Sequence, residues 1–549
     1  MSFREELKAL DVGEVFDDPK TLASASTDTS LFEVLPQLVI APRNEADLEK
    51  LVRYATENKN MVTLTARSAG TGMDGGALSE SIVLDFTKHF TRIKGFTANT
   101  GTVEPGVYYR DFERESMKRD LLMPSYPASR EICTVGGMVA NNAGGELTLT
   151  YGKTADYVKK LRVVLSDGHT HTIQPLAISE LKAKMLETTF EGELYRRMYK
   201  LVTENAKVIE AGRPRISKNS AGYALWDIHK PHEGVFDLTR LFTGSQGTLG
   251  LMSEITFGLI RPKSTSEMLV VFLDDLSKLP DIVTKTLATQ PTTFESYDDK
   301  TLRLALKFFG EFIKRLGVFK MLRIALANIP AAWSIFTKGL PKLVLQITWS
   351  GDDVGGRIEL AQAEALAVAL APFAPRLLHI TKSQAEIDEY WLIRRESFNL
   401  LRTKVKGKRT APFIDDIVVP VASLDTFLPR LNTILDEYKA YMIHNIAGHI
   451  GNGNFHIIPL MDLTDPHARA VIPEIARRVY DLVFEYGGSA TGEHNDGIIR
   501  TPFLKQQFGK EMYALFEETK KIFDPEGIFN PGKKVGGTME YATNHMARH

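Results

Sequence analysis

The sequence predicts an α+β protein with more than one domain. At roughly 100–200 residues per domain, the 549 residues of the chain correspond to two to four domains. Strand-like and helix-like segments alternate in both halves, and the second half contains the longer helices. Hydrophobic residues make up 43% of the chain, which is typical of a globular protein with large apolar cores.

The N-terminal half opens with a predicted strand–helix–strand unit. Residues 38–41 form a short apolar run, and Asn44 is a good cap for the helix that follows. That helix carries apolar residues at helical spacing, namely Leu48, Leu51, Val52 and Tyr54. Further strands are predicted at residues 61–66, 81–86 and 161–165, and a Ser-Asp-Gly turn follows at 166–168.

From about residue 266 the pattern changes to strands that alternate with longer helices. Strands are predicted at residues 268–272, 342–349, 413–419 and 441–446. Helices are predicted near residues 354–371, 384–402 and 468–486, and an amphipathic helix at 503–523 precedes an Asp-Pro-Glu-Gly stop. This order of elements indicates an α+β second domain.

The charge and cysteine content exclude several classes of function. Lys and Arg total 67 against 68 Asp and Glu, whereas a protein that binds nucleic acid would normally show a basic excess. A single cysteine excludes a disulfide framework and an iron–sulfur cluster held by four thiolates of this chain. The charged N-terminus lacks the apolar core of a secretory signal, and no apolar run approaches the ~20 residues of a membrane span. A cytoplasmic location is therefore expected.

Residues 301–340 differ from the rest because they are basic and aromatic, with Glu311 as the only acid. The basic residues include Arg303, Lys307, Lys314, Arg315, Lys320 and Arg323, and the aromatic residues include Phe308, Phe309, Phe312, Phe319 and Trp333. Such a stretch can bind a partner or lie peripherally on the anionic inner face of a membrane. The alternative is a helical insertion whose apolar face packs on its own domain.

Glycines cluster in three segments of the N-terminal half. The first contains a literal Gly-x-Gly-x-x-Gly at residues 70–75, but residues 77–80 lead into another strand. A Rossmann dinucleotide site needs a helix at that point, so the motif does not predict one. A glycine loop between strands can still cradle phosphates with its backbone N–H groups, although tight turns alone would explain a single loop. Two further loops, at 133–145 and 243–250, favour ligand binding.

A constellation of polar residues lies in the C-terminal half. Apolar runs flank a Gly- and Asn-rich segment at 448–454, which predicts a tight reversal of the chain. The reversal would bring His449 and His456 close enough to share a divalent ion. Glu493 and His494 are adjacent in another glycine-rich segment, and two histidines with one carboxylate leave metal positions open for a substrate.

In this order and spacing, the three glycine loops closely resemble the FAD-binding domain of the vanillyl-alcohol oxidase type flavoproteins. The His449–His456 segment and the Gly-Glu-His motif resemble the D-2-hydroxyacid dehydrogenase branch, which includes glycolate oxidase catalytic subunits, D-lactate dehydrogenases and D-2-hydroxyglutarate dehydrogenases. The resemblance covers residues 35–535. It implies a PCMH-type FAD-binding domain of two α+β subdomains and a ferredoxin-like α+β cap, or substrate domain. The implied boundaries are 1–265 for the FAD domain (core about 35–265), 266–490 for the cap with a helical insertion at about 300–340, and 491–549 for a C-terminal segment that returns to the FAD domain.

The resemblance implies a non-covalent FAD held by the glycine loops. The implied cofactor-binding residues are Arg67, Ser68, Ala69, Gly70, Thr71, Gly72, Gly75, Gly76, Pro124, Thr134, Gly136, Gly137, Ala140, Asn141, Gly144, Gly145, Gly247 and Asn530. Cys133 stands beside the second loop and invites a covalent or redox role, but a small buried residue is the simpler interpretation.

The resemblance also assigns roles to the C-terminal constellation. It makes His449, His456 and Glu493 ligands of a divalent metal, with Zn favoured and Mn or Fe as alternatives. It makes His494 the base that accepts the substrate proton. Asn454 would lie at the edge of the substrate or the flavin.

Arg394 aligns with the family arginine that pairs with the substrate carboxylate, and a planar guanidinium suits that contact. The alternative for Arg394 is an ordinary surface arginine. The chain departs from the common pattern at Asn452, which replaces an Asp, and at 495–496, where Asn-Asp replaces Gly and an apolar residue. Ile414 stands where some members have a lysine, which weakens the assignment to D-2-hydroxyglutarate.

The implied activity is oxidation of a D-2-hydroxy acid, such as D-lactate or glycolate, to the 2-oxo acid by hydride transfer to FAD, with the metal orienting the substrate. Three alternatives remain: an alkyl-glycerone-phosphate synthase-like transferase, a flavin-loaded subunit of a larger redox complex, and an oxidase that passes electrons to oxygen. The synthases share the FAD fold but lack both histidine motifs.

The electron acceptor is expected to be a separate molecule. Several relatives that the chain resembles carry a fused iron–sulfur module after the catalytic part. This chain has one cysteine and ends at His549, so we expect it to pass electrons to an iron–sulfur protein, a quinone or an electron-transfer flavoprotein.

Overall fold

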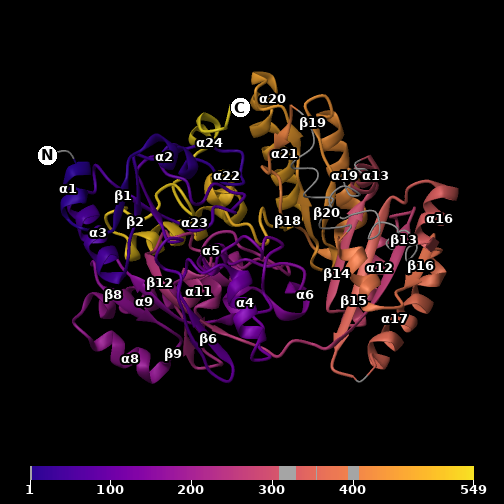
Figure 1. The fold of residues 1–549 in the computed structure, drawn as a ribbon, viewed down its shortest axis with the longest axis horizontal. Coiled ribbons are helices and arrows are strands. Elements are labelled where there is room, and N and C mark those ends of the chain that lie inside the picture. Colours follow the sequence, from indigo (N-terminus) through magenta and orange to yellow (C-terminus); the bar gives the residue numbers. More distant parts are fainter. Residues whose placement is uncertain (1–2, 308–328, 354, 393–406, 549) are drawn as a thin grey trace.

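The computed structural model describes residues 3–307, 329–353, 355–392 and 407–548. These residues form two lobes (Figure 1). The N-terminal half and the C-terminal segment, at the indigo and yellow ends of the colour bar, build one lobe together. The second half of the chain, in pink and orange, builds the other lobe. The C-terminus lies close to the place where the two lobes meet.

Two sheets organise the first lobe. Three parallel strands and one antiparallel edge strand form the first sheet, in the order β1 (Glu14–Phe16), β2 (Leu38–Ala41), β4 (Ile82–Asp85) and β3 (Leu64–Arg67). The second sheet is antiparallel, in the order β5 (Ile93–Phe96), β6 (Thr100–Val103), β12 (Leu251–Gly258), β7 (Val158–Val164) and β8 (Thr170–Ile173). The chain between β3 and β4 contains no helix, as expected from the glycine motif.

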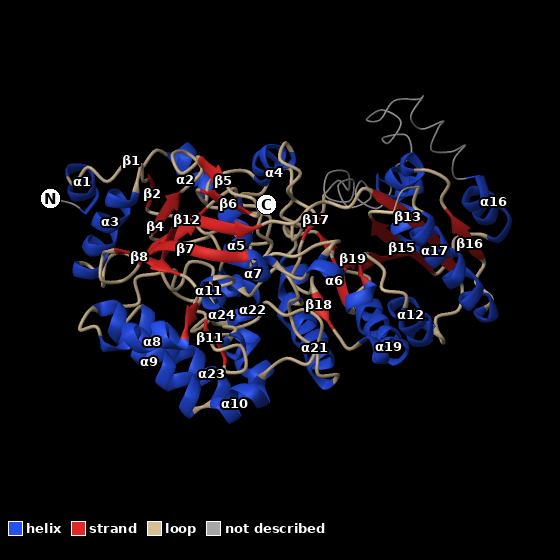
Figure 2. Ribbon diagram, turned by 90° about the horizontal axis from the view of Figure 1, so that it is seen from below, coloured by secondary structure: helices blue, strands red, loops and turns tan. Residues whose placement is uncertain are grey.

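Helices pack around these sheets and against one another (Figure 2). They are α1 (Phe3–Ala9), α2 (Pro19–Ala25), α3 (Glu45–Glu57), α4 (Tyr109–Met117), α5 (Val135–Asn141), α6 (Thr148–Tyr151), α7 (Thr154–Tyr157), α8 (Ile178–Leu186), α9 (Phe190–Glu204), α10 (Ala206–Gly212) and α11 (Thr239–Phe242). Asn44 caps α3 as predicted, because its side chain accepts a hydrogen bond from the Asp47 N–H at 3.1 Å. The small sheet of β10 (His229–Lys230), β11 (Val235–Phe236) and β9 (Leu176–Ala177) completes this lobe.

The C-terminal segment packs into the core of the first lobe. It contains α22 (Gly497–Arg500), α23 (Leu504–Phe523) and α24 (Met539–Asn544). The buried ring of Phe516 packs edge-on against Tyr223 at 6.0 Å, and Ile528 and Phe529 join the core beneath the first sheet. The helix predicted at 503–523 is present but kinked at Gly509, whose φ is 77°.

An antiparallel sheet of seven strands forms the centre of the second lobe. Its order is β16 (Leu377–Ile380), β13 (Thr265–Leu273), β15 (Leu343–Gly351), β14 (Thr293–Asp298), β20 (Ile446–His449), β21 (Asn454–Ile457) and β18 (Ile417–Val418). Side chains along β13 point alternately to the two faces of the sheet, and each face has its own apolar core. On one face, Leu269 and Val271 pack with the helices α12 (Leu279–Ala288), α17 (Arg357–Leu370) and α19 (Leu424–Glu437). Val270 packs with Tyr390 and Trp391 on the other side, so both faces are buried and the strand is continuously apolar from Met268 to Leu273.

Several predicted elements of the second lobe are shorter or divided. The strand predicted at 413–419 is ordered as β18 only, because Asp415 and Asp416 turn into a buried polar cluster and Asp416 has a φ of 70°. The strand predicted at 441–446 is two strands in different sheets, β19 (Met442–Ile443) and β20. The helix predicted at 468–486 is also divided, into α20 (Pro466–Ala470) and α21 (Ile472–Glu485), with Pro473 in the first turn of the second.

Much of the basic, aromatic stretch at 301–340 lies outside the described residues. Its described ends belong to α13 (Asp299–Lys307) and α16 (Ile329–Lys338). In α16 the rings of Trp333 and Phe336 are 66% and 83% exposed. Over the described ranges, no helix combines the length and the apolar character needed to cross a bilayer.

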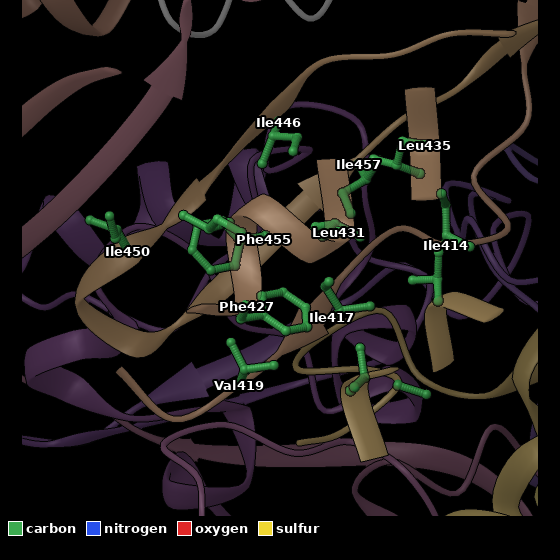
Figure 3. Packing of buried hydrophobic residues seen from close by; sticks show 14 of the residues in the cluster. Ile414, Ile417, Val419, Phe427, Leu431, Leu435, Ile446, Ile450, Phe455 and Ile457 are labelled. Carbon is green, nitrogen blue, oxygen red and sulfur yellow. The ribbon is translucent and has the colours of Figure 1, made fainter. Parts of the chain in front are cut away.

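The β20–β21 hairpin is the predicted reversal around residues 448–454. Its register places Ala447 opposite His456 and His449 opposite Asn454. Because side chains alternate along a strand, these four residues share one face of the hairpin. The opposite face is apolar and packs on α19 (Figure 3), through Ile446, Phe455, Ile457, Phe427 and Leu431.

Replacing Phe455 with alanine should destabilise the second lobe. The side chain is 1% exposed, and loss of a buried aromatic ring removes apolar contacts and leaves a cavity that costs about 3–5 kcal/mol. The measurement is the urea midpoint of unfolding followed by circular dichroism. Val368→Ala, at a site that is 75% exposed, is the matched control, and equal losses in the two variants would contradict this packing.

Candidate functional site

The glycine segments meet around an open cavity in the first lobe, where water-sized molecules have about 100 Å³ of free space. Twelve of the eighteen residues predicted to bind FAD line it: Ser68, Ala69, Gly70, Thr71, Gly72, Gly76, Thr134, Gly136, Gly137, Ala140, Asn141 and Gly247. Eight further residues line the cavity. Asp74, Gln246 and Gly250 belong to the predicted glycine segments, whereas Ala66, Ala77, Phe86, Pro105 and Met252 lie outside them.

The second glycine segment opens a helix and is not a loop throughout. Thr134 caps α5, and its hydroxyl accepts a hydrogen bond from the Gly137 N–H. A Cβ atom at Gly136 would lie 2.5 Å from the Pro105 Cβ and 2.7 Å from its carbonyl oxygen, so only glycine allows α5 to approach this closely.

Other predicted residues support the cavity from behind. The Arg67 guanidinium donates to the Thr27 carbonyl at 2.7 Å, and it lies against Gly70. The Asn530 side chain is fully buried and donates to the Gly76 carbonyl at 2.8 Å and to the Gln246 carbonyl at 2.7 Å. Asn530 therefore ties the first loop to the third. Gly75, Pro124, Gly144 and Gly145 likewise do not line the cavity.

The imidazole rings of the hairpin meet the C-terminal segment where the lobes join. The His449 Nε2 lies 2.9 Å from the Glu493 Oε1, and the His456 Nε2 lies 4.0 Å from the same oxygen. The two imidazole rings are 5.2 Å apart and nearly perpendicular. One ligand atom from each residue lies within 4.8 Å of the others, which is a spacing that one metal ion could bridge.

Buried carboxylates hold the opposite nitrogen of each ring. The His449 Nδ1 lies 2.6 Å from the Glu295 Oε1, and the His456 Nδ1 lies 3.2 Å from the Asp415 Oδ1. Imidazole ligands of metals usually have such a partner on the nitrogen that does not bind the metal. Both Nε2 atoms are thereby directed toward Glu493, so the donor set fits a divalent metal.

Asp416 positions the segment that carries Glu493 and His494. Its Oδ2 accepts hydrogen bonds from the backbone N–H of Glu493 at 2.8 Å and of His494 at 2.7 Å. Its Oδ1 accepts from the Asn454 side chain at 2.9 Å. The Lys218 ammonium, fully buried, is 2.8 Å from the Glu493 Oε1 and 3.3 Å from the Asn454 Oδ1.

These contacts set the charges of the site. Burial opposes ionisation of Glu493, but Lys218 and His449 hold the pKa of its carboxyl well below the usual range. Burial also lowers the pKa of His494, but Asp415 and Asp416 outweigh it and raise that pKa to about 9. In the metal-free protein His494 is therefore a cation at neutral pH.

Asn495 and Asp496, at which the chain departs from the common family pattern, lie between the cavity of the glycine segments and the histidine cluster. The Asn495 side chain donates to the Asn141 carbonyl at 3.1 Å and to the Gly244 carbonyl at 2.9 Å. Asp496 forms a buried ion pair with Lys534 at 2.8 Å. A Cβ atom at Gly144 would lie 3.3 Å from the Glu493 Oε2. The second glycine segment therefore touches the carboxylate that completes the histidine cluster.

Two further residues singled out from the sequence have separate outcomes. Arg394 lies outside the described residues, so its pairing with a substrate carboxylate stays a prediction. Cys133 is buried, and burial raises the pKa of its thiol to about 12, as expected for a packing residue.

Several residues of the site were not predicted: Lys153, Lys218, Glu295, Asp415, Asp416 and Arg500. Asp415 and Asp416 interrupt an otherwise apolar run, which was the one available signal. Lys153 is buried and donates to the Gly492 carbonyl at 2.6 Å, and burial lowers its pKa to about 7. Nothing in the local sequence distinguishes Lys153 or Lys218 from surface lysines.

Two family profiles cover most of the chain. Residues 36–174 match the FAD binding domain, and residues 262–534 match the C-terminal domain of the FAD linked oxidases. The chain belongs to the FAD-linked oxidases. The predicted family is thereby confirmed.

Several curated relatives of this FAD-linked oxidase have names that describe enzymes acting on hydroxy acids. The chain is 26% identical to the D-2-hydroxyglutarate dehydrogenase of Escherichia coli K12 over 517 residues, which are 92% of this chain and 49% of that protein. It is 26% identical to the glycolate oxidase subunit GlcD of Bacillus subtilis 168 over 538 residues, which are 96% of each chain. The chain thus spans about half the length of the D-2-hydroxyglutarate dehydrogenases that it matches.

Solved structures confirm the fold of this FAD-linked oxidase. The 4-ethylphenol oxidase of Gulosibacter chungangensis superposes with a TM-score of 0.68 at 15% identity, covering 98% of each chain. An alkyldihydroxyacetonephosphate synthase superposes with a TM-score of 0.63 at 16% identity, covering 96% of this chain and 84% of the synthase. At such identities the likeness establishes the PCMH-type α+β fold and nothing about substrate.

Asn530→Ala should weaken flavin binding, because it leaves the Gly76 and Gln246 carbonyls without their buried donor. An unsatisfied buried group costs about 1–3 kcal/mol, so we expect at least a tenfold loss in flavin affinity. The measurement is flavin fluorescence released on dilution of the holoprotein. Asn432→Ala, which removes a side-chain bond within α19, is the control, and equal flavin retention in both variants would contradict the clamp.

His494 should titrate near pH 9 in the metal-free protein, as followed by NMR of its ring. Since this folded-state pKa lies above the ordinary 6.5, the charged ring stabilises the fold fully below about pH 6.5. This contribution is lost as the pH rises through 9. Added Zn²⁺ should lower the pKa by like-charge repulsion, and a metal-free value near 6.5 would contradict the proposed electrostatics.

Proposed function

We propose that this protein is a FAD-dependent dehydrogenase that oxidises a small D-2-hydroxy acid, such as D-lactate or glycolate, to the 2-oxo acid. The observation that carries the proposal is the cluster of His449, His456, Glu493 and His494 against the second glycine segment. The names of the relatives support the same substrate class. A separate acceptor, such as an iron–sulfur protein, a quinone or an electron-transfer flavoprotein, would remove the electrons.

His449, His456 and Glu493 would hold a divalent metal, with Zn²⁺ favoured by the nitrogen-rich donor set. When bound, FAD supplies the hydride acceptor, and the metal supplies a Lewis acid that lowers the pKa of the substrate hydroxyl. Glu295 and Asp415 keep the two imidazole rings oriented for this task.

The chain's own residues would position the substrate and move its proton. The Nε2 of His494 would accept the hydroxyl proton, since its Nδ1 faces Asp415. Lys218 and Asn454 are polar groups beside the Glu493 carboxylate that can donate to substrate oxygens. The packed hairpin and the C-terminal segment bury the cluster and limit the access of water.

The environment of Ile414 favours a substrate with one carboxylate. Ile414 is completely buried in the apolar core of the second lobe (Figure 3). This position therefore offers no cation to a second carboxylate. D-lactate or glycolate fits that environment better than D-2-hydroxyglutarate.

Anaerobic bleaching of the bound flavin tests the proposal. We expect a D-2-hydroxy acid such as D-lactate, or achiral glycolate, to bleach the visible flavin absorption, with no bleaching by L-lactate. Prior removal of metal with a chelator should slow bleaching at least about 10–100-fold, because even outer-shell changes at metal sites cost that much. Absence of bleaching by every D-2-hydroxy acid, at full flavin content, would refute the dehydrogenase and leave the transferase or subunit alternatives.

His449→Ala should reproduce the effect of the chelator, whereas His379→Ala should behave as the wild type. His379 is the matched control because its Nε2 also contacts a carboxylate, Glu386, at 2.6 Å but lies in another part of the sheet. Peroxide release during aerobic turnover would indicate the oxidase alternative.

A further inference from the structure

Asp74 is a buried acidic residue in the wall of the glycine-lined cavity, and no step of the proposed reaction uses it. The residue is 1% exposed, and it lines the cavity together with Gln246 and Asn141. An ionised carboxylate can only accept hydrogen bonds, and it repels the negatively charged phosphates of FAD. Asp74 therefore suits a part of the cofactor that donates hydrogen bonds and carries no phosphate.

Neighbouring donors fix the orientation of the Asp74 carboxylate. The Gln246 Oε1 accepts a hydrogen bond from the Gly497 N–H at 2.9 Å, so the Gln246 Nε2 faces Asp74 and donates to its Oδ2. The Oδ1 accepts from the Gly76 N–H at 3.3 Å. Gln246 has a φ of 54°, a strained backbone conformation for a residue with a side chain, and such conformations cluster at functional sites.

The charge of Asp74 has no direct counter-ion in the described part of the chain. Burial raises the pKa of its carboxyl, whereas the Arg500 guanidinium and the two donors favour the ionised form. Lys533 and Lys534 also interact with it through space. None of these cations forms an ion pair with Asp74, and Lys534 pairs instead with Asp496 at 2.8 Å. The negative charge therefore acts on whatever fills the cavity.

The end of the cavity that holds Asp74 is the end that meets the histidine cluster. The Ile498 N–H, in the segment that follows Glu493, donates to the Asp74 carbonyl at 2.8 Å. The Asn495 side chain of the same segment donates to the Asn141 carbonyl at 3.1 Å. A hydride can pass from a substrate at the cluster only if the flavin ring lies at this end. This placement rests on the proposed function, which locates the substrate at the cluster.

We propose that Asp74 is a positioning residue that accepts the N3–H of the flavin ring and lowers the reduction potential of the bound cofactor. N3–H is the one hydrogen-bond donor of the oxidised ring system, so it is the group that suits a carboxylate. Reduction by two electrons adds negative charge to the ring, and a carboxylate beside the ring opposes that charge. A lower potential makes the reduced cofactor a stronger donor to the separate acceptor.

The first test is the midpoint potential of the bound flavin in Asp74→Asn, which keeps the shape of the side chain and removes its charge. Stepwise reduction with dithionite beside a reference dye gives the potential without substrate. We expect the ratio of reduced to oxidised flavin at a given potential to rise at least about tenfold, which is about 30 mV for a two-electron couple. An unchanged potential would overturn the proposal.

Asp237→Asn is the matched control for this test. Asp237 is a buried carboxylate of the same lobe, 7% exposed, and it does not line the cavity. Its Oδ1 accepts a hydrogen bond from the Thr239 N–H at 2.9 Å. We expect the wild-type potential in this variant, and an equal rise in both variants would overturn a specific role of Asp74.

The second test compares FAD with N3-methyl-FAD in reconstitution of the apoprotein, because the methyl group removes the N3–H donor. We expect the wild type to bind the analogue at least about tenfold more weakly, since a hydrogen bond to a charged group is lost. Asp74→Ala should bind the two flavins with similar affinity. Equal affinities in the wild type, or full discrimination in Asp74→Ala, would overturn the proposal. The wild-type comparison decides even if Asp74→Asn does not fold.

Both tests are independent of turnover, so they separate this inference from the proposed function. If no hydroxy acid bleaches the flavin but the potential and the analogue respond as expected, the proposed function fails and the role of Asp74 is supported. If D-lactate or glycolate bleaches the flavin while neither the potential nor the analogue responds to Asp74, only this inference fails.

Discussion

Burial of two adjacent carboxylates, Asp415 and Asp416, is the constraint on which the rest of the site depends. Taking a charge out of water costs several kcal/mol unless it is paired and hydrogen-bonded, so the surrounding chain must supply partners from all sides. Asp416 receives the N–H groups of Glu493 and His494, and Asp415 faces two imidazoles. These contacts place four functional side chains around one point.

The same polar cluster also joins the two lobes. The hairpin and the loop before β18 belong to the second lobe, whereas Lys218 belongs to the first. The C-terminal segment passes between them, and Asn495 bonds the backbone of two glycine segments. The histidines of the cluster come from the second lobe and Glu493 from the C-terminal segment, so the cluster forms only where the two lobes meet.

The elements with a clear period or cap were predictable from the sequence. Residues 38–41 are β2, Asn44 caps α3, and the Gly- and Asn-rich reversal brings His449 and His456 together. Errors occurred where tertiary contacts override local preference. Residues 413–416 look like the start of a strand, but the two aspartates are drawn into the polar cluster and the ladder is confined to β18. Thr134 and the glycines after it look like a loop, but they form the short helix α5, which approaches Pro105 closely because residue 136 is a glycine.

The sequence by itself determined the family, the flavin-binding segments and the identity of the histidine and carboxylate groups, because glycine spacing and short motifs encode these locally. Only the tertiary structure decided which atoms of those groups face one another. The partners of the rings, Glu295 on β14 and Asp415 before β18, are 154 and 41 residues distant from the histidines that they contact. Lys218 and Arg500 likewise reach the site from other elements. No local pattern marks such residues, because burial and charge compensation arise only when distant segments are packed together.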